Sequence, residues 1–147
     1  MNEIDDVFWA LICKPIREVY SDIEEEPFYG PGDYDKLLES FGCEIILKVD
    51  DDGYEGDSRV LYHLNGRYGL LIFGFGSCSG CDALQACQTF DEIEDLRKRF
   101  ITSIHWDTAE GMHHYIANKD WELEYCYHQE ETKRFIDEAL KLLHGLK

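Results

Sequence analysis

The stretch RVLYHLNGRYGLLIFGF, residues 59–75, decides the fold. It holds two runs rich in β-branched, aromatic and aliphatic residues, Arg59–Leu64 and Arg67–Phe75, joined by Asn65-Gly66. Asn and Gly both tolerate positive φ, so an Asn-Gly pair between two strand-like runs is the strongest short signal of a β-hairpin. The stretch therefore predicts two antiparallel strands.

Two further segments extend this hairpin into a sheet. A strand-like run, Cys43–Val49, precedes the hairpin and is separated from it by the turn-forming residues 50–53, which predicts an antiparallel meander. The segment Trp121–Tyr127 alternates large apolar residues with charged or small ones. This period of two predicts a fourth, half-exposed strand.

The remaining segments have apolar residues at helical spacing. They predict helices over about 7–20 with an interruption at Pro15, 34–41, 90–104, 109–117, and a C-terminal segment from about Phe135 to Leu143. Thr89 and Glu92 have the spacing of a capping box. The predicted fold class is α+β, with an antiparallel sheet of about four strands and helices packed mainly on one face. No repeat or linker divides the chain, so a single domain over 1–147 is expected.

The chain is strongly acidic, with 31 Asp and Glu against 14 Lys and Arg, a formal net charge of −17. Residues 1–60 carry net −12 and residues 61–147 net −5. This charge would repel nucleic-acid phosphates and anionic lipids and attract proteins with basic grooves. Direct nucleic-acid binding is not expected, and acidity that serves only solubility stays open.

The expected compartment is the cytoplasm. The longest apolar stretch, Tyr68–Phe75, is far shorter than the roughly 20 residues of a membrane span. The first six residues are acidic, where a secretion signal has positive charge followed by an apolar segment.

A cysteine knuckle follows the third predicted strand. Cys78 and Cys81 have the Cys-x-x-Cys spacing that supplies two thiolates to one tetrahedral zinc ion, and Cys87 could supply a third. His128 is the favoured fourth ligand because it follows the predicted fourth strand and could face the knuckle. The other candidates for this position are Cys126, His105, His113 and His114.

These segments are also compatible with other kinds of site. The cysteines could be reduced residues packed without metal. A thioredoxin-like redox site would need a proline facing the disulfide, but all three prolines precede the motif. A calcium loop over residues 50–55 would put Lys48 where the first carboxylate belongs, so this segment is better interpreted as a solvated hairpin turn.

The motif Gly76-Ser77-Cys78-Ser79-Gly80-Cys81-Asp82-Ala83-Leu84-Gln85, with Asp120-Trp121-Glu122-Leu123 downstream, resembles small acidic proteins encoded by phages and prophages. The resemblance covers roughly the C-terminal half. Several phage proteins of this size and acidity are anti-CRISPR inhibitors, some of which bind a type II, Cas9-type effector and keep DNA off it. The resemblance implies that the protein resides in the host cytoplasm. It does not indicate which residues bind the partner.

The leading hypothesis is a non-enzymatic, zinc-stabilised phage accessory protein. Its partner would be a host defence protein with a basic nucleic-acid-binding surface, such as a Cas9-type nuclease, whose access to DNA it blocks. The alternative is a small metal- or thiol-dependent enzyme, in which zinc keeps an open coordination position for water. A third possibility is a metal-stabilised interaction module that serves another phage process. It would have the same sequence features as the leading hypothesis and would differ only in its partner.

Overall fold

The computed structural model describes Trp9 and residues 12–32, 34–53, 55–76, 82–123 and 128–146. The elements follow one another along the chain in the order α2 (Ile16–Val19), α3 (Asp35–Glu39), β1 (Glu44–Asp50), β2 (Gly56–Leu64), β3 (Arg67–Phe75), α4 (Phe90–Ser103), β4 (His105–Asp107), α5 (Ala109–Asn118) and α6 (Gln129–His144).

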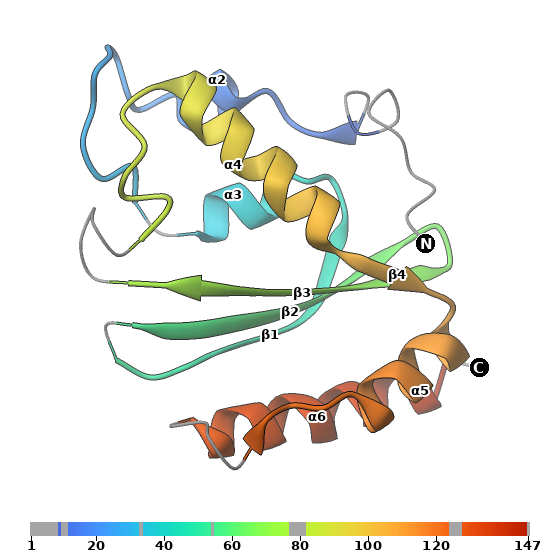
Figure 1. Ribbon diagram of the computed structural model, residues 1–147. Helices are drawn as coiled ribbons and strands as arrows, with labels where there is room; N and C mark the ends of the chain where they lie inside the picture. Colours follow the sequence, from blue (N-terminus) through green and yellow to red (C-terminus); the bar gives the residue numbers. More distant parts are fainter. Residues whose placement is uncertain are drawn as a thin grey trace.

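Within the described residues the sheet is antiparallel, with the strand order β1-β2-β3-β4 (Figure 1). Strands β2 and β3 pair continuously from Gly56 opposite Phe75 to Leu64 opposite Arg67. Asn65 (φ 51°) and Gly66 (φ 77°) form the turn between them. The predicted hairpin is confirmed, because both turn residues adopt the left-handed conformation that Asn and Gly tolerate.

Both faces of the sheet are apolar and covered by helices (Figure 1). Val60 and its partner Leu71 belong to the core under α2, α3 and α4, while Leu61 and its partner Leu70 belong to the core under α5 and α6. The α+β class with a four-stranded antiparallel sheet is confirmed. The helices are not mainly on one face as expected, because strands that are apolar on both sides need two covers.

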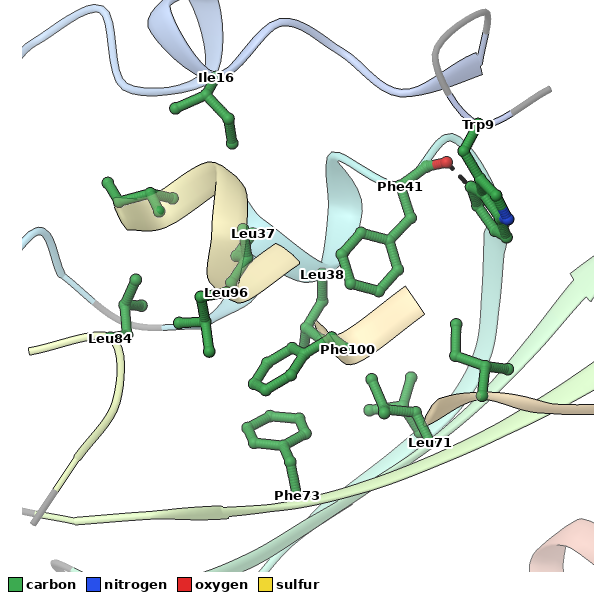
Figure 2. Packing of buried hydrophobic residues seen from close by; sticks show 14 of the residues in the cluster. Trp9, Ile16, Leu37, Leu38, Phe41, Leu71, Phe73, Leu84, Leu96 and Phe100 are labelled. Carbon is green, nitrogen blue, oxygen red and sulfur yellow. Dashed lines mark hydrogen bonds between the residues drawn. The ribbon is translucent and has the colours of Figure 1, made fainter. Parts of the chain in front are cut away.

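The core under α4 is built around aromatic side chains (Figure 2). Phe73 projects from β3 toward Phe100 of α4, with 4.7 Å between the ring centroids. Leu37 and Leu38 of α3 are completely buried beside them. Close aromatic packing of this kind contributes more than the buried area alone, so this layer fixes α3 and α4 against the sheet.

Among the described residues the fourth strand is β4, and Trp121–Leu123, the described part of the predicted strand, is not in a strand. Glu122 has φ +52°, a left-handed conformation that interrupts a strand, and residues 124–127 lie outside the described residues. Trp121 instead packs against Phe135 of α6, and its Nε1 donates a hydrogen bond to the Ile116 carbonyl at 3.0 Å. Strand β4 escaped prediction because three residues are too few to show a period.

The ends of two predicted helices follow local chemistry. The expected interruption at Pro15 is confirmed, since Pro15 precedes α2 as its N-cap residue. The capping box of α4 is also confirmed: the Thr89 side chain accepts from the Glu92 amide, and the Glu92 carboxylate accepts from the Thr89 amide.

Replacement of Gly69 by alanine is expected to destabilise the protein by about 1–3 kcal/mol, since the added methyl group overpacks a tight core. A Cβ at position 69 would lie 2.7 Å from Cγ2 of Ile104 and 2.9 Å from the Trp106 ring. Urea unfolding of Gly69→Ala measures this change. The matched control is Gly74→Ala on the same strand, where the nearest atom is 3.6 Å away and little change is expected; equal effects at both positions would contradict the packing argument.

Candidate functional sites

The base of the cysteine knuckle is held by a buried carboxylate. Cys78 and Cys81 lie outside the described residues, but Asp82 directly follows them and is 5% exposed. Its Oδ2 accepts from the Gly76 amide at 2.7 Å, and its Oδ1 accepts from the amides of Leu84 and Gln85 at 3.0 Å. The Gln85 side chain also donates to the Gly76 carbonyl at 2.8 Å. These bonds join the two ends of the knuckle.

Cys87 is buried at the far end of this segment. Its Sγ donates a weak hydrogen bond to the Ala83 carbonyl at 3.4 Å. Burial first, and then the negative charge of Glu92, raise the pKa of the Cys87 thiol to about 11. Without a bound cation Cys87 is therefore a neutral thiol at physiological pH, and it would become a thiolate only with a metal ion beside it.

The structure does not bring Cys87 and His128 together. Cys87 packs in the core under α4, whereas His128 directly precedes α6, which covers the opposite face of the sheet (Figure 1). Cys126 lies outside the described residues. The predicted parity of His128 rested on a fourth strand at Trp121–Tyr127, and the described part of that segment is not a strand.

The three other candidate histidines lie around α5. His105 stacks on Tyr115 with 3.8 Å between ring centroids. His113 lies 6.1 Å from the ring of His144, and the His114 carbonyl accepts from the Asn118 side chain. Helix α5 covers the same face of the sheet as α6, so these histidines, like His128, lie across the sheet from Cys87.

His128 belongs to a different cluster. Asp51, His128 and Glu131 each offer one ligand atom, and these atoms lie within 4.8 Å of one another. His128 Nδ1 is 3.2 Å from Glu131 Oε2, which also accepts from the Asp52 amide at 3.1 Å. Two carboxylates and an imidazole are ligand types that divalent metal ions use, so this group could hold a metal ion.

A buried ion pair adjoins this cluster. Asp51 Oδ1 lies 2.8 Å from Arg59 Nη1, and the two side chains are 2% and 3% exposed. Arg59 Nη2 donates to Thr132 Oγ1 at 2.8 Å, and Thr132 donates in turn to the His128 carbonyl at 3.0 Å. The network ties the β1–β2 turn and strand β2 to the first turn of α6.

This cluster was not predicted from the sequence. The described residues 51–53 and 55 lie between β1 and β2, as predicted, but Asp51 is buried rather than solvated. The sequence feature that could have predicted it is Arg59, a charged residue within the apolar stretch that forms the β2–β3 hairpin. A buried arginine needs a carboxylate partner, and Asp51 on the neighbouring turn supplies it.

A polar cavity of about 440 Å³ opens between the β1–β2 region and the knuckle base. Lys48 lines it, with Nζ 2.6 Å from Asp50 Oδ2 and 3.0 Å from Asp35 Oδ1. Burial alone would lower the pKa of Lys48, but the hydrogen bonds to Asp50 and Asp35 raise it overall. The amine stays protonated, which is the opposite of what a nucleophilic lysine requires.

An acidic loop, residues 21–32, lies on the α4 side of the molecule. It is held by Phe28, whose ring packs edge-on against Phe90 at 5.3 Å and whose amide donates to the Gln88 carbonyl at 3.0 Å. The Glu26 carboxylate accepts from the Phe90 amide at 2.9 Å, at the N-terminus of α4. The loop is therefore anchored to α4 at two successive points.

The anchored loop presents an aromatic side chain to solvent. Tyr29 is 78% exposed, next to buried Phe28. Asp22, Glu24 and Glu25 on the same loop are also exposed. An exposed tyrosine on an anchored acidic loop is a favourable contact for a basic protein surface, because tyrosine is enriched among the residues that dominate binding energy.

Replacement of Asp82 by asparagine should lower the free energy of unfolding by about 2–3 kcal/mol, because the side-chain amide would face the Gly76 N–H and leave a buried donor unsatisfied. Urea denaturation of Asp82→Asn measures this. Asp95→Asn on the exposed face of α4 removes the same charge and is expected to stay within about 0.5 kcal/mol of the parent protein. A loss no larger than that of the control would show that Asp82 does not hold the knuckle.

The chain was compared with models of protein families, with curated proteins and with solved structures, and none of the three comparisons gave a match. None of the described helices is long and apolar enough to cross a membrane.

Proposed function

We propose that this chain is a non-enzymatic acidic binding protein that occupies the basic nucleic-acid-binding surface of a host defence protein and blocks its access to DNA. The observation that carries the proposal is the distribution of exposed charge on a folded scaffold. A Cas9-type effector is the first partner to test, on the resemblance to phage proteins given above.

The exposed carboxylates in the N-terminal part of the described chain are the proposed acidic surface. Up to residue 60, twelve described acidic residues are exposed, against three basic ones, Lys14, Arg17 and Lys36. Fixed negative charge of this density speeds encounter with a basic groove and competes with phosphates for it. Repulsion among these negative charges lowers the stability of the fold. A role in binding would explain why the chain carries them.

The acidic loop is the proposed centre of this surface. Its attachment to α4 through Phe28 and Glu26 reduces the loop ordering that binding would otherwise require. Tyr29 then offers an aromatic face for an arginine or lysine side chain of the partner, while Asp22, Glu24 and Glu25 supply compensating charge.

A structural zinc ion in the cysteine knuckle is the proposed stabilising element. Cys78, Cys81 and Cys87 would supply three thiolates, and a fourth ligand would complete the tetrahedral site. The hydrogen bonds of Asp82 close the base of the knuckle and would orient its backbone around the ion.

A small metal-dependent enzyme is the second candidate. Asp51, His128 and Glu131 favour it, because three protein ligands leave coordination positions for water. Against it, the polar cavity described above is lined by other residues, with Lys48 held as an ion pair. Metal-dependent turnover of a substrate that Glu131→Gln abolishes would favour the enzyme over the binding protein.

Binding to a purified Cas9-type effector is expected to weaken steeply as salt rises from about 50 to 200 mM. Tyr29→Ala should raise Kd by roughly 30-fold or more, as loss of a central aromatic contact does. Glu24→Gln/Glu25→Gln should raise Kd about three- to tenfold and flatten the salt dependence. Biolayer interferometry with a DNA-cleavage assay measures both effects.

The matched control is Asp137→Asn/Glu138→Gln, which removes the same charge from the exposed face of α6. It should leave Kd within about twofold, since α6 lies on the opposite side of the sheet from the acidic loop. Absence of binding, binding that is insensitive to salt, or equal weakening by both double variants would each contradict the proposal.

Protein purified without chelator is expected to contain about one zinc ion per chain at the thiolates. Cys78→Ser/Cys81→Ser should lose this zinc together with thermal stability, as structural sites do. Elemental analysis and a thermal melt test this. Cys13→Ser, a half-buried cysteine elsewhere, should retain the zinc; protein without metal, or metal that leaves without loss of fold, would return the cysteines to a plain packing or thiol role.

A further inference from the structure

We infer that Asp51, His128 and Glu131 form a second metal site, for a divalent first-row transition-metal ion, separate from the cysteine knuckle. Their three ligand atoms lie within 4.8 Å of one another. Ligand atoms with bonds of about 2 Å to one ion lie at most about 4 Å apart, so a side-chain shift of under about 1 Å closes the group around an ion. This inference is independent of the proposed binding function.

The ligand types select the class of ion. Carboxylates alone suit magnesium, calcium and manganese, but the imidazole of His128 shifts the preference toward zinc, cobalt and their neighbours in the series. No sulfur ligand is involved, so the site is harder than the knuckle and distinguishable from it spectroscopically.

One carboxylate oxygen of Asp51 is held by an ion pair alone. Its Oδ2 accepts from the Asp57 amide at 2.8 Å, whereas Oδ1 is fully buried and accepts no hydrogen bond, although Arg59 Nη1 lies 2.8 Å away. A buried carboxylate oxygen with electrostatic compensation but no hydrogen bond has a lone pair available for a cation.

The backbone holds these side chains in place. The Asp57 and Asp52 amides orient the carboxylates of Asp51 and Glu131 respectively. Gly56 makes room for Asp51, because a Cβ at position 56 would lie 2.6 Å from the Asp51 Cβ and 2.8 Å from Oδ2. Such support around a ligand is what fixes metal geometry in proteins.

The charge balance also favours a divalent ion. Asp51, Glu131 and Arg59 together carry one net negative charge, and Asp52, Asp57 and Glu130 are exposed nearby. With a divalent ion bound, the net charge of these three residues and the ion would be one positive. The exposed carboxylates nearby would offset this positive charge. Arg59 therefore makes the site weaker than two carboxylates and an imidazole alone would be.

The position of the cluster lets an ion enter from solvent and link two elements of the fold. The His128 and Glu131 side chains are 27% and 15% exposed, so an ion can enter from solvent, while Asp51 closes the inner side. An ion here would bond the β1–β2 turn directly to the first turn of α6. Because the unfolded chain does not bring these residues together, occupancy should stabilise the fold.

The test is a titration with cobalt(II), whose visible absorption reports nitrogen and oxygen ligands and whose near-ultraviolet charge transfer reports thiolates. Full-length wild-type protein and Cys78→Ser/Cys81→Ser are expected to bind cobalt at a site without charge-transfer absorption. Glu131→Gln, which can still accept from the Asp52 amide, should weaken this binding at least about tenfold. His128→Asn removes the imidazole and keeps a residue suited to the helix N-cap, and should do the same.

Glu130→Gln is the matched control, since it removes the same charge from the adjacent exposed position of α6. It should bind cobalt like the wild type and show the same rise in Tm, about 5–10 °C at a hundredfold excess over Kd; Glu131→Gln should show no rise. No thiolate-free binding, equal weakening by Glu130→Gln and Glu131→Gln, or unchanged binding in Glu131→Gln and His128→Asn would each overturn the site.

Discussion

The uninterrupted pairing of β2 with β3 is the constraint on which the other elements depend. Because paired residues share a face, the register that sets Val60 against Leu71 also sets Leu61 against Leu70, and both faces become apolar. A sheet of this kind cannot leave either side in water. The helices of the N-terminal and middle parts cover one face, and α5 and α6 cover the other (Figure 1).

The same pairing gathers the polar chemistry at one end of the sheet. Gly56 pairs with Phe75, so the β1–β2 turn and the base of the knuckle are neighbours. Each contains a buried aspartate that accepts backbone N–H groups: Asp51 from Asp57, and Asp82 from Gly76. Asp51 turns toward α6, and Asp82 bonds Tyr34 on the α4 side. One sheet end thus has two separate anchoring sites, one on each face.

Acidity and stability oppose each other in this chain. A net charge of −17 on 147 residues produces self-repulsion that the two apolar cores must offset. Tertiary anchors, including the Asp51–Arg59 pair and the attachment of the acidic loop to α4, fix the positions of charges that would otherwise spread apart. An acidic surface held on a rigid scaffold can match a basic surface with less ordering on binding than a flexible acidic tail.

Sequence alone determined the elements whose signals are local. Asn65-Gly66 set the hairpin through the φ values it tolerates, Thr89 and Glu92 set the start of α4, and Pro15 broke the first helix. Tertiary structure alone decided which three-residue segment became the edge strand, that helices cover both faces, and that His128 meets Asp51 rather than Cys87. These outcomes depend on contacts between residues far apart in sequence, which periodicity and spacing do not encode. For the same reason the sequence predicts Asp51 to be a solvated turn residue, whereas in the structure it is buried in an ion pair with Arg59.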